Sequence, residues 1–177
     1  MNPLVSTDWL AAHLDTVRVV DASWYMPGEA REPAQEFEAA HIPGAVFFDI
    51  DGIADHSTGL PHMMPAPDTF AAAAGALGIA DGDTVVIYDG SGLFSAPRVW
   101  WALRSMGHEK AFVLDGGLPK WRRESRPLES GPAKPASARF MARPIPALAR
   151  DYEAVLAHLR RGDAQILDAR SASRFTG

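Results

Sequence analysis

The sequence contains no cysteine. Within these 177 residues, that absence excludes disulfide bonds, thiolate metal sites and a cysteine nucleophile. The chain also lacks a positively charged start followed by an apolar run. Its longest run of apolar, Ala and Gly residues, 70–80, is too short to cross a bilayer. We therefore expect neither export nor membrane insertion, and we expect a cytoplasmic location.

An excess of positive charge is lacking as well. The 17 Lys and Arg residues face 22 Asp and Glu residues, which gives a net charge of −5. A chain of this charge has no broad attraction for nucleic acid or an anionic membrane, so neither is an expected partner. The hydrophobic fraction of 47% is that of an ordinary globular protein that can bury a core.

Short apolar runs alternate with amphipathic segments along the first 125 residues. Strands are expected at 17–23, 45–48, 84–88 and 111–117, and helices at 6–14, 36–40, 68–77, 95–106 and around Trp121. Strands that are apolar throughout are typical of a parallel sheet covered on both faces. The sequence therefore predicts an α/β fold, a doubly wound parallel sheet with helices on both faces.

A long internal repeat points to duplication. The segments AAHLDTVRVVDAS, ending at Ser23, and LAHLRRGDAQILDAR, ending at Arg170, both predict a helix, a short gap and a strand, and their aspartates lie 147 positions apart. We expect a complete first domain at 1–125, a proline-rich extended linker at 126–148, and the first helix and strand (164–170) of an incomplete second copy at 149–177. The alternative is a chance likeness between two helices that lead into strands.

The segment VVIYDGSGLFSAPRVWW, residues 85–101, predicts a strand, a glycine loop and a helix. Backbone N–H groups that converge in such a loop favour an anion. Asp89, at the first loop position, is itself an anion, and we expect its carboxylate to accept these N–H groups and repel a second anion. The loop of Asp89, Gly90, Ser91 and Gly92 lacks the lysine of a phosphate-binding P-loop. A role for Asp89 as general base or phosphoryl acceptor is the weaker alternative, because no basic group stands beside it in the sequence.

Four further polar residues have a structural interpretation that we prefer to a functional one. His41 precedes a Pro-Gly turn and is expected to hold that loop by hydrogen bonds rather than to catalyse. His56 and His62 are expected to be solvated loop residues, since a metal site would need a further ligand. Arg98, at the start of a helix, is expected to form a surface or interdomain salt bridge.

The segment FEAAHIPGAVFF, residues 37–48, resembles the signature of the rhodanese family. Together with YDGSGLFSAPRVWWALRSMGH, VLDGGLPKW and LDARSASRF, it resembles the two-domain thiosulfate and 3-mercaptopyruvate sulfurtransferases, in the same order along the chain. The resemblance implies a doubly wound parallel sheet duplicated in tandem. It also implies a second-domain cysteine that carries sulfane sulfur as a persulfide to cyanide or another thiophile. We expect no metal and no cofactor.

The resemblance also implies roles for individual residues. Asp89 matches the position of the cysteine, so residues 89–92 would form a degenerate active-site loop, with the cysteine itself beyond Gly177, one repeat offset of 147 positions after Asp89. Arg174 matches the arginine that binds the donor's anionic group, and Arg170 neighbours it.

From this assignment we expect the chain alone to be inactive. Its expected partners are a small sulfur donor, a thiol or cyanide acceptor, and the remaining C-terminal half of the same protein. The sequence does not choose between thiosulfate and mercaptopyruvate. Two alternatives stay open: a non-catalytic rhodanese-like interaction or scaffold module, and a phosphatase-like relative that would need a longer cysteine loop.

Overall fold

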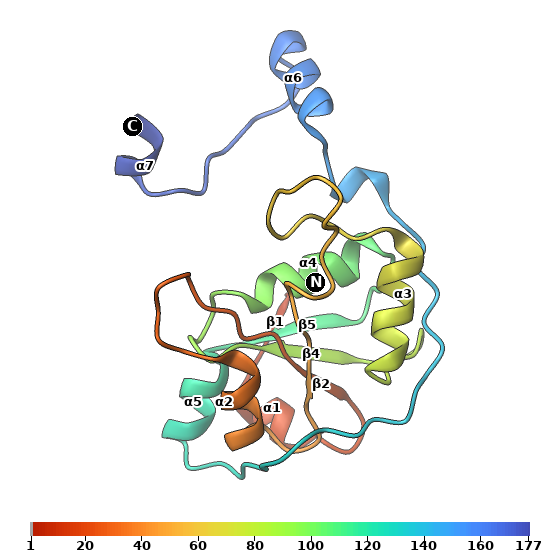
Figure 1. The fold of residues 1–177 in the computed structure, drawn as a ribbon, viewed down its shortest axis with the longest axis vertical. Coiled ribbons are helices and arrows are strands. Elements are labelled where there is room, and N and C mark those ends of the chain that lie inside the picture. Colours follow the sequence, from red (N-terminus) through yellow and green to blue (C-terminus); the bar gives the residue numbers. More distant parts are fainter. Residues whose placement is uncertain (1) are drawn as a thin grey trace. The chain divides into compact units, whose positions relative to one another are not determined.

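Five parallel strands lie at the centre of the fold in the computed structural model, which describes residues 2–177 (Figure 1). Their order across the sheet is β1-β5-β4-β2-β3, and every neighbouring pair runs parallel. The strands are β1 (Leu4–Val5), β2 (Arg18–Asp21), β3 (Val46–Phe47), β4 (Val85–Tyr88) and β5 (Ala111–Leu114). Strands β2 to β5 were predicted. The edge strand β1 was not, because two residues make no recognisable run.

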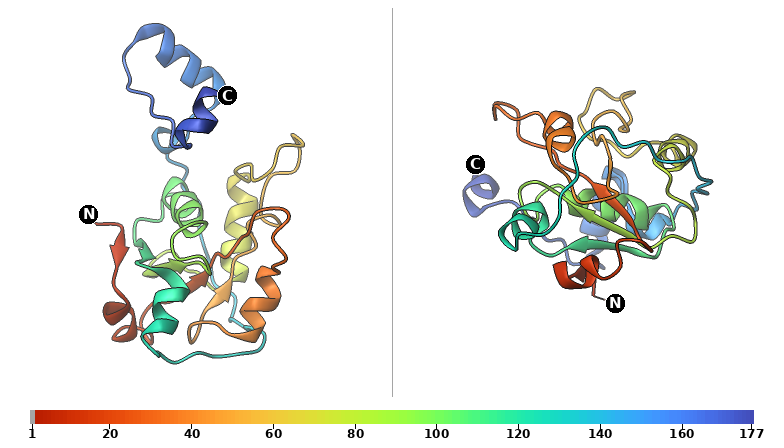
Figure 2. Two further views of the ribbon diagram at one scale, coloured as in Figure 1. Left: turned by 90° about the vertical axis from the view of Figure 1, so that its left-hand side faces the viewer. Right: turned by 90° about the horizontal axis from the view of Figure 1, so that it is seen from below.

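Helices cover both faces of this sheet, as the sequence predicts (Figures 1 and 2). They are α1 (Thr7–Ala11), α2 (Pro33–Ala39), α3 (Pro67–Ala76), α4 (Ala96–Ser105) and α5 (Gly117–Arg123). Three of them carry a proline in the first turn, where a missing N–H costs no helical hydrogen bond. Helix α1 begins where expected, since the Ser6 hydroxyl accepts the Trp9 N–H at 3.1 Å, but it ends before residue 14.

The central strand β4 supplies side chains to two cores. Val85 and Ile87 pack with α3 and α4, whereas Val86 and Tyr88 pack with α1, α2 and α5, and all four residues are fully buried. Each buried side chain of this size contributes about 1.5–3 kcal/mol relative to its exposed state. The uninterrupted apolar run in the sequence is therefore explained by burial on both faces.

The expected linker is extended but lies against the first domain. The Ala138 N–H donates to the carbonyl of Gly75 in α3 at 2.9 Å, and the Arg143 N–H donates to the carbonyl of Met106 at 2.8 Å. Phe140 is buried, and its ring centroid lies 5.7 Å from that of Phe70. The first compact unit accordingly continues to Ile145, and residues 146–177 form a second unit.

The second unit contains a short 3-10 helix at Pro146–Leu148 and two helices, α6 (Tyr152–Arg161) and α7 (Ala172–Thr176). Helix α6 was predicted, whereas α7 was not. The predicted strand at 164–170 is wrong: these residues form no strand, and the side chain of Leu167 is 79% exposed. A strand forms only where a neighbour accepts its hydrogen bonds, and no described strand pairs with this segment. Across residues 2–177, no helix has the length and apolar character needed to span a membrane.

Candidate functional site: the Asp89 loop

The candidate site lies at the carboxyl edge of the sheet. Asp21 ends β2, Asp89 directly follows β4, and the neighbouring parallel strands bring these two positions to the same edge. In doubly wound sheets, ligands bind outside the carboxyl ends of the strands. The loop that the sequence singles out is therefore placed where this fold binds ligands.

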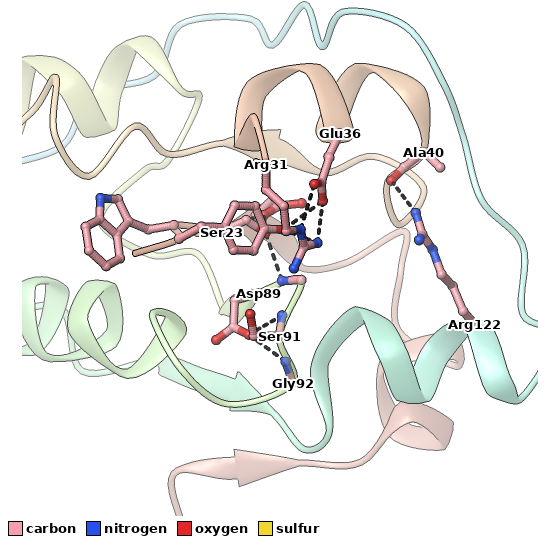
Figure 3. Close-up of polar contacts among 12 residues, drawn as sticks. Ser23, Arg31, Glu36, Ala40, Asp89, Ser91, Gly92 and Arg122 are labelled. Carbon is pink, nitrogen blue, oxygen red and sulfur yellow. Dashed lines mark hydrogen bonds and ion pairs between the residues drawn. The ribbon is translucent and has the colours of Figure 1, made fainter. Parts of the chain in front are cut away.

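The Asp89 carboxylate fills its own loop (Figure 3). Its side chain is buried, and both oxygens accept hydrogen bonds only from backbone N–H groups of the loop and of the start of α4. Oδ1 accepts from Ser91 at 2.9 Å and Gly92 at 2.7 Å, and Oδ2 accepts from Phe94 at 2.7 Å, Ser95 at 3.0 Å and Ala96 at 2.9 Å. The prediction that this carboxylate accepts the loop amides is confirmed.

These hydrogen bonds also make Asp89 the cap of α4. The free N–H groups at a helix start normally bond to a side chain close in sequence, and Ser95 was the expected start of this helix. The Ser95 hydroxyl instead accepts the Trp24 N–H at 3.2 Å. A carboxylate seven residues before Ala96 lies outside the usual capping pattern, so the sequence alone did not reveal this role.

A second set of buried hydrogen bonds joins the loop to β2. The Gly90 N–H donates to Ser23 Oγ at 2.8 Å, and the Ser23 hydroxyl donates to Asp21 Oδ1 at 2.5 Å. Burial raises the pKa of Asp21, and the two hydrogen bonds from Ser23 oppose that rise. A Cβ atom at Gly90 would lie 2.4 Å from Tyr25 Oη, so only glycine fits here without a shift. None of these contacts was anticipated from the sequence.

The loop borders a cavity of about 240 Å³. It is lined by Trp24, Ile50, His62, Phe94, Ser95 and Arg98. The surface salt bridge expected for Arg98 is wrong, since its guanidinium donates to the His62 carbonyl and lies 4.9 Å from the Trp101 ring. The interdomain salt bridge that was its alternative stays a prediction. Burial lowers the pKa of Arg98. The half-buried position thus gives Arg98 a carbonyl and an aromatic face as partners.

Two of the three histidines singled out in the sequence contact neighbouring residues. His41 Nδ1 lies 2.7 Å from the Phe37 carbonyl and its ring stacks on Phe37, so the expected structural role is confirmed. His62 is not simply solvated, because its Nδ1 lies 2.7 Å from Asp51 Oδ1. His56 is exposed, as expected. Among residues 2–177, no group of three or more His, Cys, Asp or Glu side chains could hold a metal ion.

Arg170 and Arg174 belong to the second unit. Arg170 Nη2 lies 2.5 Å from Asp168 Oδ2, and the hydrogen bonds from Arg170 lower the pKa of Asp168. Arg174 lies on α7 and is exposed. The Asp89 loop belongs to the first unit, so the expected role of these arginines in donor binding stays a prediction.

The chain is similar to proteins of a known family. A model of the rhodanese-like domain matches residues 6–124. The chain belongs to the rhodanese family. It is 44% identical to the mitochondrial thiosulfate/3-mercaptopyruvate sulfurtransferase 1 of Arabidopsis thaliana, over 99% of this chain and 52% of the relative. It is 45% identical to the human 3-mercaptopyruvate sulfurtransferase, over 98% of this chain and 61% of the relative.

A solved structure agrees with this assignment. The crystal structure of SseA from Escherichia coli, described as a 3-mercaptopyruvate sulfotransferase with the rhodanese fold, matches with a TM-score of 0.93 at 43% identity. The match covers 99% of this rhodanese chain and 68% of the E. coli chain. The chain thus spans between 52% and 61% of the two curated relatives described above.

Proposed function

We propose that this rhodanese chain is part of a sulfurtransferase that moves sulfane sulfur from thiosulfate or 3-mercaptopyruvate to a thiophilic acceptor such as cyanide. The observation that carries the proposal is identity of 44% and 45% to relatives with these names, over nearly the whole chain. We assign residues 1–125 to an N-terminal non-catalytic domain, residues 126–148 to a linker and residues 149–177 to the start of the catalytic domain. Helix α6 in the last segment supports the repeat that suggested this division.

The chemistry needs a nucleophilic sulfur that these residues lack. In the proposed reaction, a thiolate attacks the sulfane sulfur of thiosulfate, the S–S bond breaks, and sulfite leaves with the bonding electron pair. The persulfide then gives its outer sulfur to cyanide, which yields thiocyanate and restores the thiolate. Backbone N–H groups at a strand-to-helix loop favour such an anionic sulfur. In this chain the five N–H groups of the equivalent loop already bond to Asp89.

Arg174 and Arg170 are proposed to bind the anionic group of the sulfur donor. A guanidinium offers donors in a planar fork that matches two oxygens of a carboxylate or sulfonate. Arg170 already forms hydrogen bonds of 2.9 and 2.8 Å from Nε to the Asp168 carboxylate, which holds its side chain in place. Arg174 has no such bond from its side chain among the described contacts and is the freer of the two.

A direct assay tests the proposal. The 177-residue chain and the protein extended through the predicted cysteine loop are compared for thiocyanate formation from thiosulfate and cyanide, and in parallel with 3-mercaptopyruvate as donor. We expect turnover only in the extended protein, and its loss when that cysteine is replaced by serine. Turnover by the chain alone would contradict the assignment of its first domain as non-catalytic. An extended protein with a cysteine-free loop would instead support the scaffold alternative.

The description of residues 89–92 as a degenerate active-site loop has its own test. In an Asp89→Cys variant, the new thiol would face the N–H groups that now bond to the carboxylate, so we expect its pKa below the usual value of about 8.5. Ser137→Cys, at an exposed connector position, is the matched control. Ultraviolet titration of the thiolate measures both values, since the chain has no other cysteine. Equal pKa values in the two variants would contradict the description.

A further inference from the structure

A second cavity lies at the opposite edge of the sheet, where β2 and β3 begin. Its volume is about 310 Å³, at the lower end of the roughly 300–1,000 Å³ of small-molecule sites. The lining comes from the start of β2, from residues 41–46 and from connector residues 129–135, and its charged or titratable members are Arg18, His41, Glu129 and Lys134. We call this cavity the amino-edge pocket.

Arg18 is the unusual residue in the amino-edge pocket. Its Nε atom is buried and has no hydrogen-bond partner, and its side chain forms no ion pair with any described residue. The guanidinium carbon packs close to Gly78 after α3, since a Cβ atom there would lie 3.6 Å from it. Arg18 as a whole is half-buried, but a buried N–H donor such as its Nε–H is normally paired, because an unmet buried donor is costly. The geometry holds a cation in place and leaves its donors without a protein acceptor.

The other polar groups of the pocket do not neutralise Arg18. Glu129 Oε2 accepts the Gly44 N–H at 2.9 Å and lies 4.0 Å from His41 Nε2, so this carboxylate is engaged elsewhere. Lys134 is exposed and forms no ion pair within the described part of the chain. Arg18 and Lys134 therefore lie in the pocket without a paired anion. The one carboxylate of the pocket, that of Glu129, already bonds to other groups.

We propose that the amino-edge pocket binds a small oxyanion, with the Arg18 guanidinium as its principal ligand and Lys134 as a second cation. A guanidinium offers parallel N–H donors that match two oxygens of a phosphate, sulfate or carboxylate group, and such charge-assisted bonds are the strong ones. The Nη groups of Arg18 are not among the sealed buried atoms, so they are the donors that a bound anion would meet. This site is separate from the Asp89 loop and does not depend on the proposed sulfur transfer.

In the test, inorganic phosphate is titrated into the 177-residue chain. The phosphate replaces chloride, so that the ionic strength stays constant. Calorimetry measures affinity, and the NMR signal of the Arg18 guanidinium reports binding beside it. We expect saturable binding of one phosphate and a shift of that signal, neither of which chloride produces. A parallel titration with sulfate and thiosulfate shows whether the pocket accepts oxyanions in general.

Three variants separate this site from non-specific attraction. Arg18→Gln is expected to weaken phosphate binding at least about tenfold, the effect of losing one charge-assisted hydrogen bond. Lys134→Gln, at an exposed position that the fold does not depend on, is expected to weaken it about threefold. Arg123→Gln removes the same charge from the exposed face of α5 and should change affinity by less than about twofold.

The proposal is overturned if phosphate binding does not saturate, or if chloride replaces phosphate equally well. It is also overturned if Arg18→Gln binds as tightly as the unmodified chain, or if Arg123→Gln weakens binding as much as Lys134→Gln does. Circular dichroism establishes that each variant is folded. Should Arg18→Gln fail to fold, the comparison of Lys134→Gln with Arg123→Gln and the shift of the Arg18 signal still decide the outcome.

Discussion

Replacing Asp89 by asparagine is expected to cost the first domain a large part of its stability. The side chains have the same shape, but asparagine keeps one acceptor oxygen and turns the other into an NH₂ donor. Because Oδ1 accepts two N–H groups and Oδ2 accepts three, at least two backbone donors lose their acceptor in either orientation. Hydrogen bonds to a charged group contribute about 1.5–3 kcal/mol each, so the loss is about 3–6 kcal/mol. The free energy of unfolding of a typical domain is only about 5–15 kcal/mol in total.

Urea unfolding followed by tryptophan fluorescence measures this loss. All five tryptophans lie between positions 9 and 121, so the signal reports the first unit alone. With a slope of about 1–3 kcal/mol per molar urea, the midpoint should fall by at least about 1 M. Asp115→Asn is the matched control, since Asp115 forms an exposed pair with Lys120 at 2.8 Å, and such pairs contribute about 0–1 kcal/mol. Equal midpoint shifts in the two variants would refute the argument that the carboxylate holds the loop.

Three further outcomes are expected. Gly75→Ala should lower the free energy of unfolding by about 1–3 kcal/mol despite its better helix propensity, because the new Cβ would lie 2.6 Å from the Ala138 carbonyl oxygen; urea midpoints check this. Burial lowers the pKa of His108 from 6.5, so the native state binds fewer protons there than the unfolded chain. The contribution of His108 to the free energy of unfolding is therefore complete above about pH 6.5 and falls as the pH drops below that value. In His108→Gln, the free energy of unfolding should depend less on pH in that range. Saturating phosphate should raise the melting temperature of the unmodified chain by more than that of Arg18→Gln.

The sequence predicted those parts of the fold whose causes are local. The run at 84–88 is apolar on both faces and bounded by turn residues, so β4 and its loop were recognisable, and the charge of Asp89 made its hydrogen bonds to the loop foreseeable. Contacts between distant segments carried no such signal. Ser23 reaches Gly90 across 67 positions, and Arg98 reaches the His62 carbonyl across 36. The failed strand at 164–170 has the right residue pattern, but a pattern supplies no neighbour to pair with.

The two ends of the parallel strands differ in whether their charged side chains are paired. This difference bears on where the domain alone is expected to bind an anion. At the carboxyl edge, an incoming anion would have to displace a carboxylate that is tethered to the loop and accepts five N–H groups. A tethered group competes at a very high effective concentration, so we expect small anions in solution to be excluded there. The Asp89 loop then serves to hold the start of α4 and to position Phe94 and Arg98 around their cavity. At the amino edge, Arg18 is held with its Nε–H unmet. Anion binding by this domain is therefore expected at the end of the sheet where doubly wound folds do not usually bind ligands.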